Sequence, residues 1–211
     1  RQGGALKVAL YKNYAPFSYE GKGIDVDIAA ALAAKLQVKV VPVWFSSDEK
    51  LDDDLRKMVW NGTPFTSPAD VMMHAPVDPQ WAATVDKVRI IAPYHRERFA
   101  VARHREQLPA LESLAPFEGV PFAVTGESMA GDVMLSADGG RYRSNARIFK
   151  VTEDAINALK SGAVAAAFAE QGELEAELRD DARFVIETPP HPMLKLPQWS
   201  VGLAVKSGST E

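Results

Sequence analysis

The sequence of 211 residues contains no cysteine, which excludes disulfide bonds, thiol nucleophiles, iron–sulfur clusters and cysteine zinc sites. No apolar run reaches the ~18 to 20 residues that a membrane-spanning helix needs. The N-terminal stretch 1–4 lacks the apolar segment of a signal peptide, so we expect a mature or trimmed soluble chain. Charge of either sign is modest, because 28 acidic and 24 basic residues give a formal net charge of -4. A general nucleic-acid or anionic-membrane binder is therefore not expected.

Catalytic motifs are also absent. The sequence has no G-x-S-x-G elbow, phosphate-binding P-loop, G-x-G-x-x-G fingerprint or H-E-x-x-H. Serine, histidine and aspartate occur, but no spacing singles out a triad. The four histidines have no metal-type spacing; they are His74, His95, His104 and His191. We therefore predict no catalytic residue, no metal site and no cofactor.

Hydrophobic residues make up 46% of the chain, which is ample for a core. In the first half, short apolar or β-branched runs alternate with segments whose apolar residues recur every three to four positions. This pattern predicts strands at 6–11, 38–43 and 69–73, with helices from Asp25 and from about Asp48 to Asn61. This order of strand, helix, strand, helix and strand implies a parallel sheet with covering helices.

The same order begins again after a polar, proline-broken connection at 104–119. Strands are predicted at 120–124, 147–151 and 164–168, with helices at 128–137 and 152–160. Further strands are expected at 88–92, 98–103 and 183–187, a helix at 170–179, and a last strand at 200–205 that can pair with 98–103. We predict an α/β fold of two lobes, 1–95 and 96–198, with a return segment at 199–211. Open α/β sheets bind ligands at the carboxyl ends of their parallel strands, so we expect a ligand between the lobes.

The identities of particular residues support the prediction of a two-lobed α/β fold. Leu6 to Leu10, Tyr14 to Ser18 and Gly23 to Ala29 together resemble the opening of the family 3 (amino-acid type) periplasmic solute-binding proteins of ABC importers. Later stretches fit the same family and extend the resemblance over nearly the whole chain: 69–71, 92–94, 125–128, 158–162 and 199–205. The resemblance implies a two-lobed, venus-flytrap periplasmic-binding-protein fold, each lobe a mostly parallel sheet with covering helices. It also implies a periplasmic location with the export signal removed.

One departure from the family concerns the ligand. Its amino-acid binders usually carry a threonine and an arginine after the third strand, and these clamp the ligand's α-carboxylate. The corresponding stretch here, 74–83, contains no arginine, so a free amino acid would lose its main anchor. Trp81 stands roughly at that place, either as an apolar or cation-stacking face or as a packing residue. The acid that takes the ammonium group in the family falls at or near Glu170, so half of the clamp is expected to persist.

Several candidate functional residues allow two interpretations. Tyr14 and Phe17 follow the first strand, where the resemblance places an aromatic wall, although one of them could instead fill the core. Asp25 and Asp27 fall on the first turn of a helix, where capping is favoured over acid–base or metal work. His74 follows the third strand and either binds a ligand oxygen or serves as a local donor.

In the second half, the turn at 125–131 either presents backbone N–H groups to a ligand or has no ligand role. The acidic runs at 52–54 and at Glu173, Glu175 and Glu177 are interpreted as solvated helix faces. The predicted ligand-binding residues of the whole chain are Tyr14, Phe17, His74, Ala75, Pro76, Val77, Tyr94, Glu127, Ser128, Met129 and Glu170.

We therefore predict a non-enzymatic, monomeric periplasmic solute-binding protein that delivers its ligand to a transport system. Without the arginine clamp, the ligand is expected to be apolar or weakly polar, lipid- or sterol-like or aromatic, rather than a free amino acid. Expected partners are this small molecule and membrane transporter components or a periplasmic protein, with no nucleic acid. Three alternatives stay open: an accessory partner of a quinoprotein dehydrogenase, an amino-acid-binding protein with an altered clamp, and a sensor domain or enzyme on the same scaffold.

Overall fold

The structure is a computed structural model that describes residues 4–47, 50–77 and 86–209. Compactness divides the chain into two units. Unit 1 comprises 1–96 and 199–211, and unit 2 comprises 97–198. The chain passes between them twice, within strand β4 (Val88–His104) and at the start of strand β9 (Gln198–Lys206).

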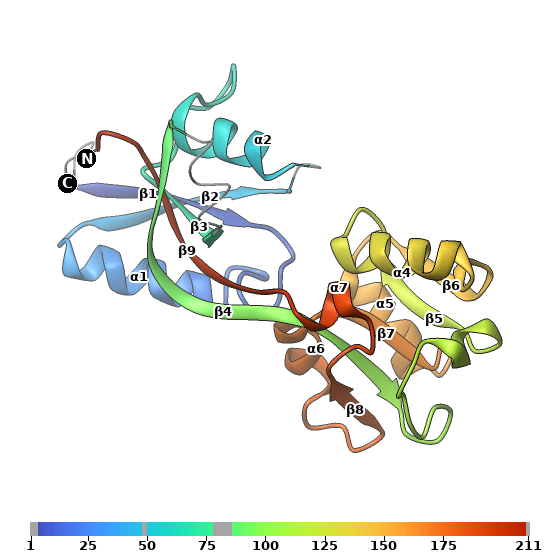
Figure 1. Ribbon diagram of the computed structural model, residues 1–211. Coiled ribbons are helices and arrows are strands. Elements are labelled where there is room, and N and C mark those ends of the chain that lie inside the picture. Colours follow the sequence, from blue (N-terminus) through green and yellow to red (C-terminus); the bar gives the residue numbers. More distant parts are fainter. Residues whose placement is uncertain (1–3, 48–49, 78–85, 210–211) are drawn as a thin grey trace. The chain divides into compact units, whose positions relative to one another are not determined.

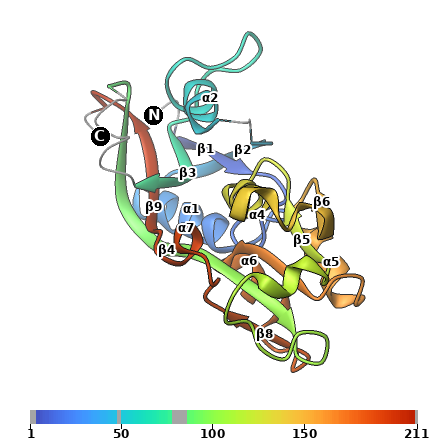
Figure 2. The ribbon, with the colours of Figure 1, turned by 45° about the vertical axis from the view of Figure 1, so that its right-hand side comes forward.

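Unit 1 is built on a mixed sheet in the order β2-β1-β3-β9, with β4 next to β9. Strand β1 (Ala5–Tyr11) is parallel to β2 (Lys39–Phe45) and β3 (Val71–Val77), whereas β9 is antiparallel to β3. Helix α1 (Ile24–Lys35) lies on one face of the sheet and α2 (Leu51–Leu55) on the other, as both views show (Figures 1 and 2). A π-helical turn, Arg56–Trp60, continues α2.

The period-2 alternation of β1 creates the two cores of unit 1. Leu6, Val8 and Leu10 point to one face, where they pack with α1 residues such as Ala29. Ala9 points to the other face, with Leu55 of α2 and other buried residues. Strand β1 is therefore covered on both faces, as expected of a strand inside a parallel α/β sheet.

Unit 2 has a sheet in the order β4-β7-β5-β6. Strand β5 (Phe122–Thr125) is parallel to β6 (Ala146–Phe149) and to β7 (Ala166–Glu170). The second part of β4 is antiparallel both to β7 and to β8 (Phe184–Glu187). The helices of this unit are α4 (Met129–Gly140), α5 (Thr152–Lys160), α6 (Gln171–Leu178) and the short α7 (Pro192–Lys195).

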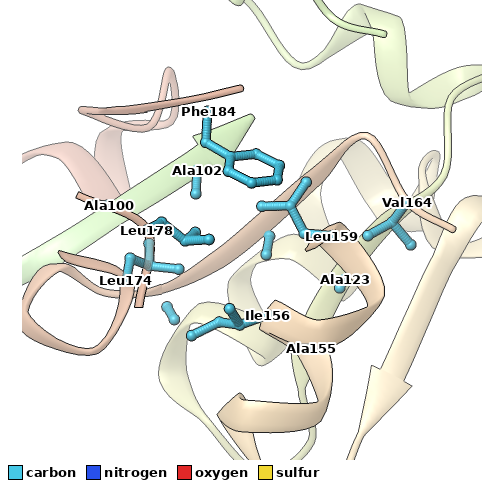
Figure 3. Packing of buried hydrophobic residues seen from close by; sticks show 12 residues of the cluster. Ala100, Ala102, Ala123, Ala155, Ile156, Leu159, Val164, Leu174, Leu178 and Phe184 are labelled. Atoms are coloured by element: carbon cyan, nitrogen blue, oxygen red, sulfur yellow. The ribbon is translucent and has the colours of Figure 1, made fainter. Parts of the chain in front are cut away.

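The core of unit 2 also has two sides. On one side, Ile156 and Leu159 of α5 meet Leu174 and Leu178 of α6, with Phe184 of β8 beside them (Figure 3). On the other side, the three fully buried rings of Phe117, Phe122 and Phe168 pack with centroids 4.9–5.8 Å apart. The inward positions predicted for the helix at 152–160, at Ala155, Ile156 and Leu159, are buried as expected.

The predicted α/β fold class is confirmed, but some strand assignments are wrong. The segments 88–92 and 98–103 belong to one 17-residue strand, β4. The last strand does not pair with 98–103, because β7 and β8 occupy both edges of that part of β4. Instead β9 lies beside β3 and beside the first part of β4, where Gly202 closely approaches the backbone of Ile91 and Pro93. The backbone of α4 becomes non-helical at Ala137, where that helix was predicted to end.

Candidate functional site

In unit 1, His74 occupies a β-bulge in the middle of β3, and not the loop after the third strand where the sequence places it. The register between β3 and β9 shifts between Met72 and Ala75. His74 itself has a φ of 61°, in the left-handed region that few residues other than glycine adopt. A bulge leaves one residue out of the strand pairing and redirects its side chain. Here it places a histidine that is only 6% exposed against other polar groups of unit 1.

Asp25 and Tyr94 surround this histidine. The Tyr94 hydroxyl accepts a hydrogen bond from the His74 backbone N–H at 2.9 Å and donates one to Asp25 Oδ1 at 2.7 Å. His74 Nδ1 lies 3.2 Å from Asp25 Oδ2, at ion-pair distance, and is hydrogen-bonded to Asp25 Oδ1 at 3.5 Å. Since a carboxylate can only accept, we assign the imidazole proton to Nδ1. Nε2 then faces the Tyr14 hydroxyl at 3.3 Å.

This arrangement corrects the capping role expected for Asp25. The N-cap of α1 is Gly23, and no side chain forms a capping bond there. Asp25 is instead 1% exposed and is held by groups from β3 and β4. Burial raises the pKa of Tyr94 well above its usual value of 10.0, and the negative charge of Asp25 acts in the same direction. Tyr94 is therefore a neutral hydrogen-bond donor at physiological pH.

The aromatic residues of the first loop have different positions. Phe17 is fully buried, with its ring centroid 4.3 Å from that of His74 and 5.0 Å from that of His95. Its side chain fills the core of unit 1, which is the alternative to the aromatic wall that the sequence left open for one of these two residues. Tyr14 is half-buried, and its ring packs edge-on against His74 at a centroid distance of 4.8 Å. Of the two, Tyr14 is the residue whose side chain reaches the surface.

Unit 2 contains a pocket of about 170 Å³ at the carboxyl ends of its parallel strands. The strands contribute Phe99 from β4, Thr125 from β5, and Ala169 and Glu170 from β7. The first turns of three helices complete the wall, which is lined in full by Phe99, Thr125, Ser128, Met129, Ala130, Thr152, Ala169, Glu170 and Glu173. The pocket thus combines apolar atoms with three hydroxyls and two carboxylates.

The turn before α4 is held by its own hydrogen bonds. Ser128 Oγ donates to the Thr125 carbonyl at 2.6 Å and accepts from the Gly131 N–H at 3.0 Å, so Ser128 is a side-chain N-cap. Gly131 is required at this point, since a Cβ would lie 2.3 Å from the Thr125 oxygen. The N–H groups of Gly126 and Asp132 also bond within unit 2. Part of the expected anion-binding surface is therefore already used by the backbone.

Three glutamates meet at the start of α6. Glu170 is the N-cap residue, at the junction with β7. Glu173 bonds back to the backbone of Glu170 and to the Thr152 side chain, a pattern similar to a capping box. Glu97 of β4, only 2% exposed, accepts hydrogen bonds from the N–H groups of Arg98 at 2.9 Å and Gly172 at 3.3 Å.

Electrostatics make Glu173 exceptional among these acids. Burial raises its pKa from an ordinary value of 4.5 to about 8, and the negative charges of Glu170 and Glu97 add to the rise. The hydrogen bonds from Thr152 and from the Glu170 backbone act against this shift but are outweighed. Glu173 is therefore mostly protonated at pH 7. Its partly buried carboxyl contradicts the prediction of a solvated acidic face for this residue.

The structure brings some predicted site residues together and separates others by unit. Tyr14, Phe17, His74 and Tyr94 cluster in unit 1, where Ala75 is fully buried and Pro76 and Val77 are partly buried at the end of β3. Ser128, Met129 and Glu170 line the pocket of unit 2, whereas Glu127 is exposed beside it with a φ of 56°. Trp81 and the rest of 78–85 lie outside the described residues.

The residues predicted from the sequence do not include Thr152 and Glu173, which line the pocket, or the buried Glu97. One sequence feature distinguishes Glu173: it stands three residues after Glu170, which ends β7 and is the N-cap of α6. This spacing is that of a capping box. Within the ranges that the structure describes, no group of three or more His, Asp or Glu side chains could hold a metal ion. Among the described helices, none has the length and apolarity to cross a membrane.

Comparison with known proteins gives matches in structure but not in sequence. No family model matches the chain, and no curated protein does. An ancestral cationic amino acid solute-binding protein, AncCDT-1, is similar with a TM-score of 0.72 and 22% identity, over 99% of this chain and 84% of that one. Holo ArgBP from T. maritima is similar with a TM-score of 0.65 and 20% sequence identity, over 97% of this chain and 83% of that one.

A third similar structure is the GluR0 ligand-binding core in complex with L-glutamate. It has a TM-score of 0.67 and 18% identity, and the match covers 98% of this chain and 86% of that one. Matches of this kind extend over nearly the whole chain at about 20% identity and therefore establish the fold. The chain has the mixed α/β fold of the type II periplasmic binding proteins, the fold that these amino-acid-binding structures share.

Proposed function

We propose that this chain is a solute-binding protein that captures a small molecule carrying a cationic amine or guanidinium group. The observation that carries the proposal is the acidic pocket of unit 2, where Glu170 and Glu173 line the wall and the negative charges of Glu170 and Glu97 act on Glu173. Carboxylates removed from water are costly unless a positive group or hydrogen bonds compensate them. A ligand cation would supply that compensation, and the hydroxyls of Thr125 and Thr152 could accept its remaining N–H bonds.

The size of the pocket supports a head group rather than a lipid. Its volume of about 170 Å³ is below the roughly 300–1,000 Å³ of pockets that enclose drug-sized molecules. The expected apolar or sterol-like ligand has no support from the comparisons. We therefore favour the alternative of an amino-acid-type binder with an altered clamp, in which the acid at Glu170 is retained.

The named ligands of the similar structures agree with this chemistry. They include a protein for cationic amino acids and proteins bound to arginine, although one is bound to L-glutamate. In this proposal the chain binds and releases its solute unchanged, works in the periplasm as a monomer, and delivers the solute to membrane components of an ABC importer. The accessory role beside a dehydrogenase stays an untested prediction.

A thermal-shift screen tests the proposal. At concentrations near 100 times the Kd, L-arginine or L-lysine should stabilise the protein by ~2.7 kcal/mol. For a protein of this size, such a gain raises Tm by roughly 5 °C or more. N-Acetylnorleucine, which has no cationic amine, and sterols should have a much smaller effect.

Paired variants localise the effect. Glu170→Gln should remove most of the shift because it deletes one negative charge from the pocket wall. The control Glu177→Gln lies on the exposed side of the same helix, where Glu177 pairs with Lys160 at 2.5 Å, and should keep the shift. A protein stabilised by sterols and indifferent to every amine would contradict the proposal.

A further inference from the structure

Glu173 stands apart from the other acids of unit 2 because of its surroundings. Its own element brings Glu170 at the N-cap, and β4 brings Glu97, both negative. From α5 it receives the Thr152 hydroxyl, while the charged residues of that first turn, Glu153 and Asp154, are exposed. The acids near the N-terminus of α4, Glu127 and Asp132, are also exposed. Like charges thus act on Glu173 from the N-cap of its own helix and from β4.

Two positive side chains on neighbouring elements, Arg98 and Lys160, interact with other residues of α6. Arg98 of β4 donates through Nε to the side-chain oxygen of Gln171, and its charge lowers the pKa of Glu175. Lys160 pairs with Glu177. Two like charges around a partly buried carboxyl favour its neutral form, and an added cation would reverse that balance. A ligand cation is therefore in competition with one proton for the same pocket.

We propose that Glu173 determines the charge class of the solute: a cationic group enters the pocket in exchange for the proton of Glu173, whereas a neutral group binds without proton release. The inference rests on the proposed function, because it assumes that the solute enters this pocket. It adds a specific role for one residue and a coupling between binding and pH. The proton leaves the Glu173 carboxyl for solvent as the cation arrives, so the net charge of the site is conserved.

Linkage gives the sign of the pH effect. The pKa of about 8 in the free protein means that the exchangeable proton is present below pH 8 and is lost above it. Binding that releases one proton strengthens by at most about tenfold for each pH unit. The affinity for a cation should therefore rise between pH 6 and pH 8 and become level above pH 8. L-Arginine keeps its side-chain charge throughout this range.

Calorimetric titration with L-arginine measures the exchange. At pH 7, the binding enthalpy should depend on the ionisation enthalpy of the buffer, with a slope that corresponds to between about 0.5 and 1 proton released. Glu173→Gln, which keeps the shape of a protonated glutamate, should bring this slope to near zero and remove the rise in affinity with pH. The control Glu177→Gln should behave as the wild type.

Each result has a distinct meaning. Binding of L-arginine without proton release, or with the same release in Glu173→Gln, would overturn the inference and leave the proposed function standing. No binding of L-arginine at millimolar concentration would overturn the proposed function and the inference together. If Glu173→Gln fails to bind, Glu173→Asp separates the two roles: it should restore proton release if exchange at this position is correct, and its failure to do so would overturn the exchange.

Discussion

Replacing Asp25 with alanine is expected to lower the free energy of unfolding of unit 1 by about 3–5 kcal/mol. Asp25 is 1% exposed and accepts a hydrogen bond of 2.7 Å from Tyr94, with His74 Nδ1 at 3.2 Å. Alanine would leave a buried hydroxyl and a buried imidazole N–H without their acceptor. Asp25→Asn keeps an oxygen acceptor and should cost less, about 1–2 kcal/mol.

Urea unfolding followed by tryptophan fluorescence would measure this loss. All four tryptophans fall within the sequence ranges of unit 1, so the signal reports on that unit. Asp27→Ala provides a matched control, because Asp27 lies on the same helical turn but is exposed. It should cost only the favourable interaction with the helix dipole, about 0.3–1 kcal/mol. Equal losses for the two variants would show that the Asp25 network does not support unit 1.

The stability of unit 2 should fall as the pH rises from about 4.5 to 8, and Glu173→Gln should remove that fall. The folded-state pKa of Glu173 is raised to about 8 by burial and by like charges. Over this window the folded state binds more protons than the unfolded state, so the stabilising effect of the proton is complete below pH 4.5 and lost near pH 8. The difference between the two proteins should reach a few kcal/mol at pH 8.

Circular dichroism at several pH values measures this second effect, since helices α1 and α2 in unit 1 and α4, α5, α6 and α7 in unit 2 give each unit a helical signal. At pH 5 the wild type and Glu173→Gln should be about equally stable, and at pH 8 the variant should be the more stable of the two. Glu177→Gln is again the control. Stability curves that stay parallel across the range would mean that Glu173 is ionised in the folded protein.

Much of the fold follows from sequence patterns with a local cause. The β-branched and apolar runs gave correct strands in both halves, and the apolar spacing at Ala155, Ile156 and Leu159 placed a helix and its buried face. The merging of 88–92 and 98–103 into β4 was not predictable in this way. The partners that hold this long strand, β7, β8 and β9, come from far along the chain.

The candidate site was less predictable because it depends on contacts between distant residues. Asp25 has the sequence position of a helix cap, yet its partners His74 and Tyr94 are 49 and 69 residues away. Glu173, Glu175 and Glu177 look alike as an acidic run, but a helix turns about 100° per residue and gives neighbouring positions different surroundings. Only Glu173 faces Glu97 and Thr152, a fact that requires the packing of α6 against β4 and α5.

The most direct test of the central claim is mass spectrometry of the small molecule that co-purifies with the protein under native conditions. The account predicts a solute of low mass with a basic amine or guanidinium group, detected as a positive ion and lost from Glu170→Gln. A neutral lipid or sterol, or an organic anion without a basic nitrogen, retained equally by the wild type and by Glu170→Gln, would contradict it.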